Sequence, residues 1–380
     1  MASSSTPGPP AAASLAMGRR SAVKAFLVEW IKLNWADCVC MAAVGGVAYG
    51  VFVSPVPVTR TFPITFDGSG DIVYPELAYP FRGWIIAPWA SGTLSILGPI
   101  VVYLAAQVRM RSAWEASAAM MGSAQAVLLA SVFQVVLKQL IGGLRPYFLD
   151  VCMPDVSRAA GHNATGLNGV GYGRLMYTTD VCTQPDAQRL QAAVTSFPSG
   201  HSTATFAGFG FLFLWMNAKL KVWADHRPAF WKLALTMLPL LLASLIACSL
   251  TVDAAHNWYD ILAGSLIGLV MALASYRATY AALWDWRFNH MPLRQAEPFP
   301  YAAPDAACPA RTLTQSAGWG DTSAWLAHRL DSATSSAVFA QRRGGAAAEM
   351  TPRPADGGLD HPQQQSGRSK RHPLREGEAV

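Results

Sequence analysis

His256 and Asp260 stand between two long apolar runs, and their spacing suits acid–base chemistry. Residues 233–250 and 261–276 contain no charged side chain. On a helix, two residues four positions apart lie on one face, one turn from each other. A carboxylate placed there can hold one imidazole nitrogen and leave the other free to react. The alternative is a buried hydrogen-bonded pair that only fixes two helices.

A second polar cluster, residues 196–203, comes immediately before another apolar segment. Its Pro198-Ser199-Gly200 sequence is typical of a turn. A turn that leads into a helix presents backbone N–H groups and the positive end of the helix dipole to an anion. Gly200 allows a close backbone approach, and His201 can deliver a proton. An ordinary helix cap with a hydrogen-bonded histidine is the alternative for this cluster alone.

Two cations follow an apolar segment farther upstream. Lys138 and Arg145 are seven positions apart, close to two helical turns, so both side chains can point one way. Pro146 then ends or bends the helix. Taken alone, the pair is more simply explained as interfacial cations that reach lipid headgroups.

Together the three clusters suit a phosphate ester. They combine two cations, an N–H cradle with a hydroxyl, two histidines and a carboxylate. The cations and N–H groups would stabilise negative charge on the phosphate oxygens. One histidine would attack phosphorus, and the other would protonate the leaving oxygen. The sequence shows neither an acidic triad for Mg²⁺ nor Cys/His zinc spacing, so we expect no metal and no other cofactor.

The composition points to a membrane protein. Only 14% of the 380 residues are charged and 52% are hydrophobic, against about 25% charged in an average soluble domain. Six apolar segments are each about long enough to cross ~30 Å of hydrocarbon. They lie near residues 36–53, 91–108, 117–137, 202–217, 233–250 and 258–276.

The distribution of basic residues predicts the orientation of these segments. If the N-terminus is cytosolic, the cytosolic stretches hold 13 Lys and Arg in 58 residues, and the opposite stretches hold 6 in 98. This bias follows the positive-inside rule and places both termini in the cytosol. The connections 54–90, 139–201 and 251–257 then lie on the other side of the membrane, so the three polar clusters share one membrane face.

The long connection 139–201 carries two features of a lumenal or extracellular segment. Asn163-Ala-Thr165 is an N-glycosylation sequon. Cys152 and Cys182 are the only cysteines of this connection, and they either form a disulfide or remain free thiols. We expect an endomembrane, such as that of the vacuole, or the plasma membrane.

The chain divides into three parts. Residues 1–34 are expected to be a disordered, cytosolic N-terminus, unstructured over 1–17, with a short interfacial helix over 21–34. Residues 35–285 form the membrane domain. Residues 286–380 are rich in Ala, Pro, Gly, Ser and Gln, and we expect a disordered cytosolic tail.

The three clusters resemble the motifs of a known family. Lys138-x6-Arg145-Pro146, Pro198-Ser199-Gly200-His201 and the segment from Ser249 to Asp260 are similar to those of the type-2 phosphatidic acid phosphatases. The resemblance covers about residues 35–285 and is greatest to lipid phosphate phosphatases and diacylglycerol pyrophosphate phosphatases. It implies an all-α bundle of six transmembrane helices with a haloperoxidase-like core. It also implies a lipid phosphate as the partner, and no nucleic acid.

The resemblance assigns a role to each candidate residue. It implies that His256 is the nucleophile and forms a phosphohistidine, that Asp260 orients it, and that His201 protonates the leaving alkoxide. The family hydrolyses phosphatidate, lysophosphatidate and diacylglycerol pyrophosphate without a metal. The groups implied to hold the phosphate are Lys138, Arg145, Ser199 and the N–H of Gly200.

One position departs from the family pattern. The third motif normally has Arg directly after its Ser, and here Leu250 follows Ser249. Loss of one charge contact to phosphate could cost several kcal/mol of transition-state stabilisation. A cation such as Arg82 could substitute, the substrate could differ, or the protein could be weak or inert. The alternatives to a hydrolase are therefore a non-catalytic lipid-phosphate binder or scaffold, and a transferase that uses the same phosphohistidine.

Overall fold

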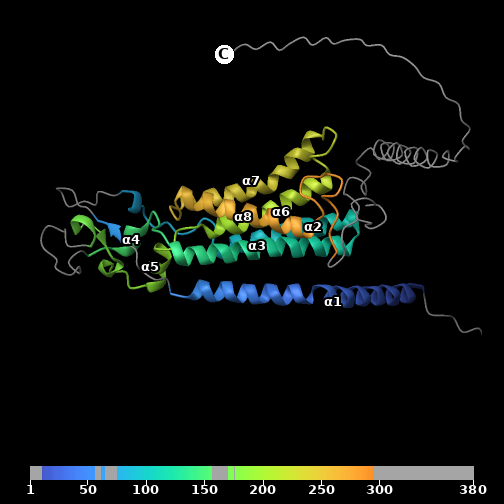
Figure 1. The fold of residues 1–380 in the computed structure, drawn as a ribbon, viewed down its shortest axis with the longest axis horizontal. Coiled ribbons are helices and arrows are strands. Elements are labelled where there is room, and N and C mark those ends of the chain that lie inside the picture. Colours follow the sequence, from blue (N-terminus) through green and yellow to red (C-terminus); the bar gives the residue numbers. More distant parts are fainter. Residues whose placement is uncertain (1–10, 56–60, 65–74, 156–169, 175, 295–380) are drawn as a thin grey trace, which may run out of the picture. The chain divides into compact units, whose positions relative to one another are not determined.

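The computed structural model describes residues 11–55, 61–64, 75–155, 170–174 and 176–294, which are mostly helical (Figure 1). The long helices are α1 (Ala11–Val53), α2 (Pro88–Met110), α3 (Ala113–Ile141), α6 (Gly200–Leu220), α7 (Phe230–Val252) and α8 (Trp258–Thr279). Shorter elements are α4 (Phe148–Cys152), α5 (Ala187–Ala193) and the 3-10 turns η1 (Pro75–Leu77), η3 (Tyr172–Arg174) and η4 (Thr179–Val181). A two-stranded antiparallel ladder joins β1 (Phe62–Pro63) to β2 (Met176–Tyr177).

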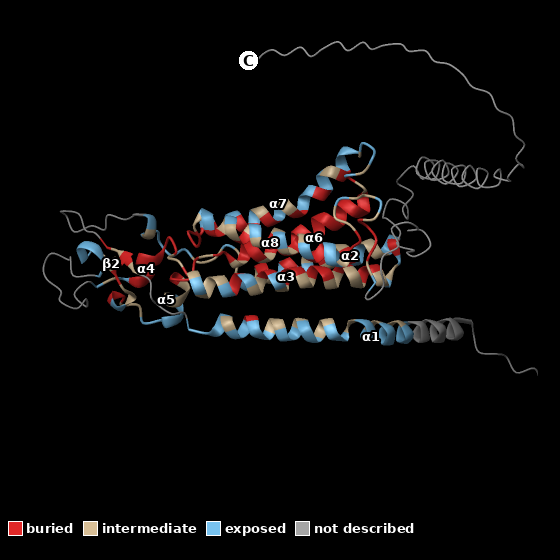
Figure 2. Cartoon of the chain, in the orientation of Figure 1, coloured by how far each residue is buried: buried red, intermediate tan, exposed pale blue. Residues whose placement is uncertain are grey.

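Helix α6 forms the centre of the bundle and packs against α2, α3, α7 and α8. Figure 2 shows α6 almost wholly buried, whereas α1 and α7 carry exposed and half-buried residues. Small residues allow this close packing. A Cβ on Gly208 would lie 2.0 Å from the backbone oxygen of Ser95 in α2, and one on Gly268 of α8 would lie 2.5 Å from that of Thr203. The helix backbones therefore touch directly at these two crossings.

Within the residues that the structure describes, five helices are long and apolar enough to cross a membrane: α1 over Val23–Val53, α2, α3, α7 and α8. Their outward faces carry stripes of exposed apolar side chains, such as Leu97, Val101, Leu104 and Val108 of α2. The sixth predicted segment, 202–217, lies in α6, which is not among the five. Because protein surrounds α6, the helix can carry polar groups such as Lys219, which pairs with Glu115 at 2.6 Å.

Helix α1 differs from the prediction at the N-terminus. The unstructured stretch 1–17, the interfacial helix 21–34 and the span 36–53 were expected to be separate. Instead, one helix runs from Ala11 to Val53. The prediction is wrong from Ala11 onward because the Ala, Leu and Met residues there favour a helix and no proline interrupts the chain before Pro55. Residues 1–10 and the predicted tail beyond 294 lie outside the described residues.

A small apolar cluster covers one end of the bundle, where α4 and α5 lie (Figure 1). Phe62, Phe148, Val151 and Tyr177 are buried in it. The structure joins Cys152 and Cys182 of the same cluster in a disulfide with an S–S distance of 2.01 Å. The sequon residue Asn163 lies outside the described residues. This cluster anchors the connection that leads from α3 to α6.

Candidate active site

The candidate residues come together at the end of the bundle that carries α4 and α5. Lys138 lies in the last turn of α3, His201 in the first turn of α6, and Asp260 in the first turn of α8. Arg145 and His256 belong to the connections that join these helices. All of them are buried except Lys138, which is half-buried. The alternating direction of the helices brings these distant stretches to one place.

His256 lies between a carboxylate and a guanidinium. Its Nδ1 is 3.5 Å from Oδ2 of Asp260, and its Nε2 is 3.5 Å from Nη1 of Arg145. The two residues were expected to share a helix face, but α8 begins at Trp258 with Asn257 as its N-cap. Asp260 therefore reaches back toward the turn that holds His256, and it accepts the N–H of Asn257 at 2.9 Å. The pair forms through a helix cap, because a residue two positions before the first turn is not on the helix.

Ser196 completes the hydrogen bonds around this pair. Its hydroxyl donates to Oδ2 of Asp260 at 2.5 Å and lies 3.4 Å from Nδ1 of His256. It is fully buried. The sequence placed Ser196 in the second cluster without a role, because nothing in its spacing shows a contact across 64 positions. A hydroxyl on the carboxylate fixes the orientation of Asp260 toward the ring.

Burial and charge together determine the protonation of His256. Burial lowers its pKa well below 6.5, and the nearby charge of Arg145 lowers it further. The hydrogen bond with Asp260 raises the pKa of His256, but by less than burial and Arg145 lower it. Burial and the charge of Arg145 therefore favour the neutral ring. With a proton on Nδ1 toward Asp260, the lone pair of Nε2 faces Arg145 and is available as a nucleophile.

Backbone carbonyls hold the two cations in place. Arg145 donates from Nε to the carbonyl of Ala192 at 2.6 Å and from Nη1 to that of Ala255 at 2.9 Å. Lys138 donates from Nζ to the carbonyl of Thr195 at 2.8 Å. A guanidinium has five N–H donors, so these bonds leave donors for an anion. Among the described residues, neither side chain forms an ion pair with a carboxylate, so both can offer their N–H groups to an anion near His256.

The turn before α6 acts as a helix cap in the structure. Ser199 is the N-cap, and its hydroxyl accepts the N–H of Ser202 at 3.4 Å. Its own N–H donates to the carbonyl of Asp260 at 3.0 Å, which ties α6 to α8. Gly200 is the first residue of α6. The N–H groups at the start of a helix have no partner within the helix, so that of Gly200 remains suited to an anion.

His201 is held by a loop that the motifs did not include. Its Nε2 lies 3.0 Å from the carbonyl oxygen of Ile86. The ring of Trp84 stacks on it, with centroids 5.5 Å apart and an angle of 19° between the planes. Trp84 also lies 5.2 Å from Cζ of Arg145. Trp84 was not among the predicted site residues, since stacking on a distant histidine has no local signal in the sequence.

Leu250 occupies the position of the family arginine and is fully buried in the apolar cluster. Its carbonyl accepts the N–H groups of Ala255 at 3.0 Å and of His256 at 3.3 Å. The backbone at Leu250 therefore closes the turn that carries the histidine. Arg82, the suggested substitute cation, is exposed and makes no described contact with the other candidate residues.

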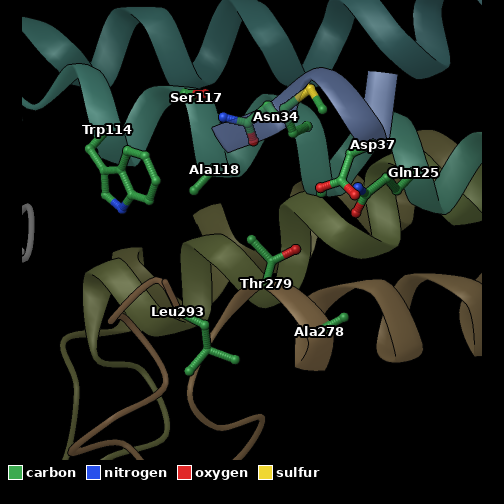
Figure 3. A pocket seen from close by; sticks show the side chains of 11 residues that line it. Asn34, Asp37, Trp114, Ser117, Ala118, Gln125, Ala278, Thr279 and Leu293 are labelled. Carbon is green, nitrogen blue, oxygen red and sulfur yellow. The ribbon is translucent and has the colours of Figure 1, made fainter. Parts of the chain in front are cut away.

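A cavity of about 110 Å³ lies elsewhere, between α1, α3 and α8 (Figure 3). Asn34, Asp37, Ser117 and Thr279 are among its lining residues, and none of the candidate residues lines it. The described part of the chain contains no group of three His, Cys, Asp or Glu side chains arranged to hold a metal ion. The candidate site is separate from this cavity. It lies at the last turn of α3 and the first turn of α8 and consists of hydrogen-bonded and cationic side chains.

Comparisons with known proteins agree with this architecture. Residues 119–284, which include all seven candidate catalytic and phosphate-binding residues, match the PAP2 superfamily. A PA-phosphatase related-family protein of Dictyostelium discoideum is 31% identical over 258 residues, which are 68% of this chain and 72% of the relative. Diacylglycerol pyrophosphate phosphatase 1 of Saccharomyces cerevisiae is 35% identical over 44% of this chain and 53% of its own length. Lipid phosphate phosphatase 2 of Arabidopsis thaliana is 29% identical over 57% and 69%.

No solved structure matches the chain significantly. The apolar helices and these relatives make it an integral membrane protein. The ordered motifs, the helical bundle around them and the matches over most of the Dictyostelium relative lead to one assignment. The chain belongs to the PAP2 superfamily, the family of the type-2 phosphatidic acid phosphatases.

Proposed function

We propose that the protein is an integral membrane phosphatase that removes phosphate from lipid phosphates. Its substrates are monoesters and pyrophosphates such as phosphatidate, lysophosphatidate and diacylglycerol pyrophosphate. The observation that carries the proposal is the position of His256, with Nδ1 at 3.5 Å from Asp260 and Nε2 at 3.5 Å from Arg145. Relatives named for lipid phosphate and diacylglycerol pyrophosphate hydrolysis support the substrate class.

The reaction proceeds in two steps that need only the chain's own groups. In the first, Nε2 of His256 attacks phosphorus, the P–O bond to the lipid breaks, and His201 gives a proton to the departing oxygen. In the second, His201 takes a proton from water, the water oxygen attacks the phosphohistidine, and inorganic phosphate leaves. Charge on the phosphate oxygens is stabilised by Lys138, Arg145 and the N–H of Gly200, with Ser199 shaping the turn.

The proposed topology has six spans, including α6, and both termini in the cytosol. The site then faces the lumen of an endomembrane compartment or the cell exterior. The excess of basic residues in the cytosolic stretches supports this orientation. So does the disulfide of Cys152 and Cys182, because disulfides persist in oxidising compartments. Residues 35–285 form the phosphatase domain between a cytosolic N-terminal segment and the tail 286–380.

Leu250 favours a second candidate function, a family member that binds lipid phosphates with little or no turnover. The family arginine is absent, and the apolar side chain that replaces it is fully buried. Such a protein would retain the cations and the N–H groups that hold phosphate. It would bind phosphatidate without releasing phosphate.

One experiment separates these functions. The purified protein is assayed for phosphate release from phosphatidate in detergent micelles without added Mg²⁺, beside His256→Ala and His201→Ala. The matched control is His226→Ala, because His226 is exposed in the connection between α6 and α7. We expect release by the wild type and the control, and loss of about 10³-fold or more in His256→Ala. Equal rates in all variants would refute the site, and tight binding without release would favour the second function.

A further inference from the structure

The loop before α2 contacts the proton-donating side of the site directly. Trp84 stacks on His201 at 5.5 Å and lies 5.2 Å from Cζ of Arg145. Two residues later, the carbonyl oxygen of Ile86 lies 3.0 Å from Nε2 of His201. The histidine is thus held both at its ring face and at one ring nitrogen by a segment more than 100 positions away in the chain.

The contact with Ile86 determines which nitrogen of His201 carries a proton. A carbonyl oxygen can only accept a hydrogen bond, so Nε2 must be the donor. The other nitrogen, Nδ1, is then left for exchange of a proton with a substrate. His256 is arranged in the same way, with Nδ1 toward Asp260 and Nε2 on the side of Arg145. The carbonyl of Ile86 therefore orients the ring of His201, as the carboxylate of Asp260 orients the ring of His256.

Two further features hold this loop segment in position. The N–H of Ile85, between Trp84 and Ile86, donates to Oδ2 of Asp253 at 2.9 Å. Asp253 is the C-cap of α7, so the bond fastens the loop to the end of a long helix. Gly83 has φ of +81°, a conformation that favours glycine. It turns the chain just before Trp84.

We propose that Trp84 and Ile86 are positioning residues for proton transfer from His201 to the leaving oxygen, and that Asp253 fixes the segment that carries them. The proposal rests on the phosphatase function proposed above. It predicts a selective defect: loss of Trp84 impairs the step in which a poor leaving group must be protonated. An ester with a good leaving group needs little protonation and is affected less.

The test compares two substrates in the full-length protein. Octyl phosphate releases a strongly basic alkoxide, and 4-nitrophenyl phosphate releases a weakly basic phenolate. The compared quantity is kcat/KM, which reports the steps up to formation of the phosphohistidine and not its hydrolysis, a step that both esters share. For Trp84→Leu we expect kcat/KM to fall about 10- to 100-fold on octyl phosphate and less than about 3-fold on 4-nitrophenyl phosphate. His201→Ala gives the same selective pattern in kcat/KM with a larger loss. The control Trp89→Leu, whose side chain is 76% exposed, changes neither rate.

Additional variants keep the proposal testable if Trp84→Leu does not fold. Trp84→Phe retains an aromatic face and should recover most of the octyl phosphate rate. Asp253→Leu removes the acceptor for Ile85, whereas Asp253→Asn keeps an oxygen, so only the former should show the selective loss. Equal losses on both substrates, or no loss, in an active protein would overturn this proposal alone. A wild type that hydrolyses neither ester would overturn it together with the phosphatase function.

Discussion

Arg145 is bonded to the backbone of the turn that carries His256 as well as facing the ring. Its Nη1 donates to the carbonyl of Ala255 at 2.9 Å and lies 3.5 Å from Nε2 of His256. This bond holds the guanidinium beside the turn that carries the histidine, which keeps cation and nucleophile together. The same proximity disfavours a charged imidazole, because two positive charges would face each other in a buried place.

The first prediction concerns the pH profile. Protonation of His256 removes its nucleophilic lone pair, and its pKa is held well below 6.5 by burial and by Arg145. The acidic limb of kcat/KM is therefore expected below pH 6.5, so activity persists as the pH falls through the ordinary histidine range. In Arg145→Gln the charge is lost and the pKa of His256 rises. The acidic limb should move to higher pH, and the plateau should fall about 10²- to 10³-fold.

The measurement is the pH dependence of phosphate release for the wild type and Arg145→Gln. Lys138 and Asp260 also act on His256 and are unchanged in this variant. An acidic limb at the same pH in both proteins would show that Arg145 does not influence the histidine. A variant with an unaltered plateau would show that the guanidinium does not stabilise the transition state.

The second prediction concerns Ser196. Ser196→Ala removes the hydroxyl that donates to Asp260 at 2.5 Å, and bonds to charged groups contribute about 1.5–3 kcal/mol. In this variant Asp260 still accepts the N–H of Asn257, so its side chain is held less firmly but stays near His256. We expect kcat to fall about 10-fold, which corresponds to about 1.4 kcal/mol. Ser265→Ala is the matched control, since Ser265 bonds only within α8 in the described structure. Equal kcat values in the two variants would contradict the role of Ser196.

The sequence was sufficient to predict that the three clusters lie at one end of a helical bundle. Residues such as Lys138 and His201 stand at predicted helix ends, and alternating helix direction then determines which ends meet. The structure shows the expected contact between His256 and Asp260, but the two residues do not share one face of a helix, because α8 begins only at Trp258. Asn257 before the first apolar turn was the available signal, since Asn is a favoured N-cap and an acidic residue three positions later completes a capping box.

Other parts of the site have no signal in a single sequence. Ile86 acts through its carbonyl, so its residue type says nothing about its contact with His201. Trp84 meets His201 and Arg145 through tertiary packing, which leaves no periodicity or spacing. The separate helix expected over 21–34 was wrong, since α1 continues through the charged residues Lys24, Glu29 and Lys32 to Val53. Charged residues do not end a helix unless a cap or a proline accompanies them.

The third prediction concerns Leu250. Its side chain is fully buried among apolar neighbours that include Tyr147 and Phe148. Leu250→Arg places a charge in this cluster, which costs several kcal/mol when the charge has no partner. We therefore expect a lower Tm and no gain in kcat. Leu250→Met is the control and should change stability by less than about 1.5 kcal/mol. A rise in phosphate release at unchanged Tm would show that the arginine reaches the substrate and that the family contact can be restored.

The last prediction separates stability from catalysis. At the end of the bundle away from the site, Lys219 and Glu115 form a fully buried ion pair at 2.6 Å. Trp215 and Tyr280 also donate to Oε1 of Glu115, at 3.0 and 2.8 Å. Lys219→Met leaves the carboxylate without its cation, and loss of one partner of a buried pair costs about 3–5 kcal/mol.

We expect thermal unfolding of Lys219→Met in detergent to occur at a clearly lower temperature, while kcat of the folded protein stays near that of the wild type. Lys32→Met is the matched control, because Lys32 is exposed on α1, and its Tm should not change. Glu115→Gln combined with Lys219→Met should recover part of the lost stability, since no unpaired charge then remains. A double variant less stable than Lys219→Met would show that Glu115 is held mainly by Trp215 and Tyr280. A fall in kcat together with Tm would show that the two ends of the bundle are coupled.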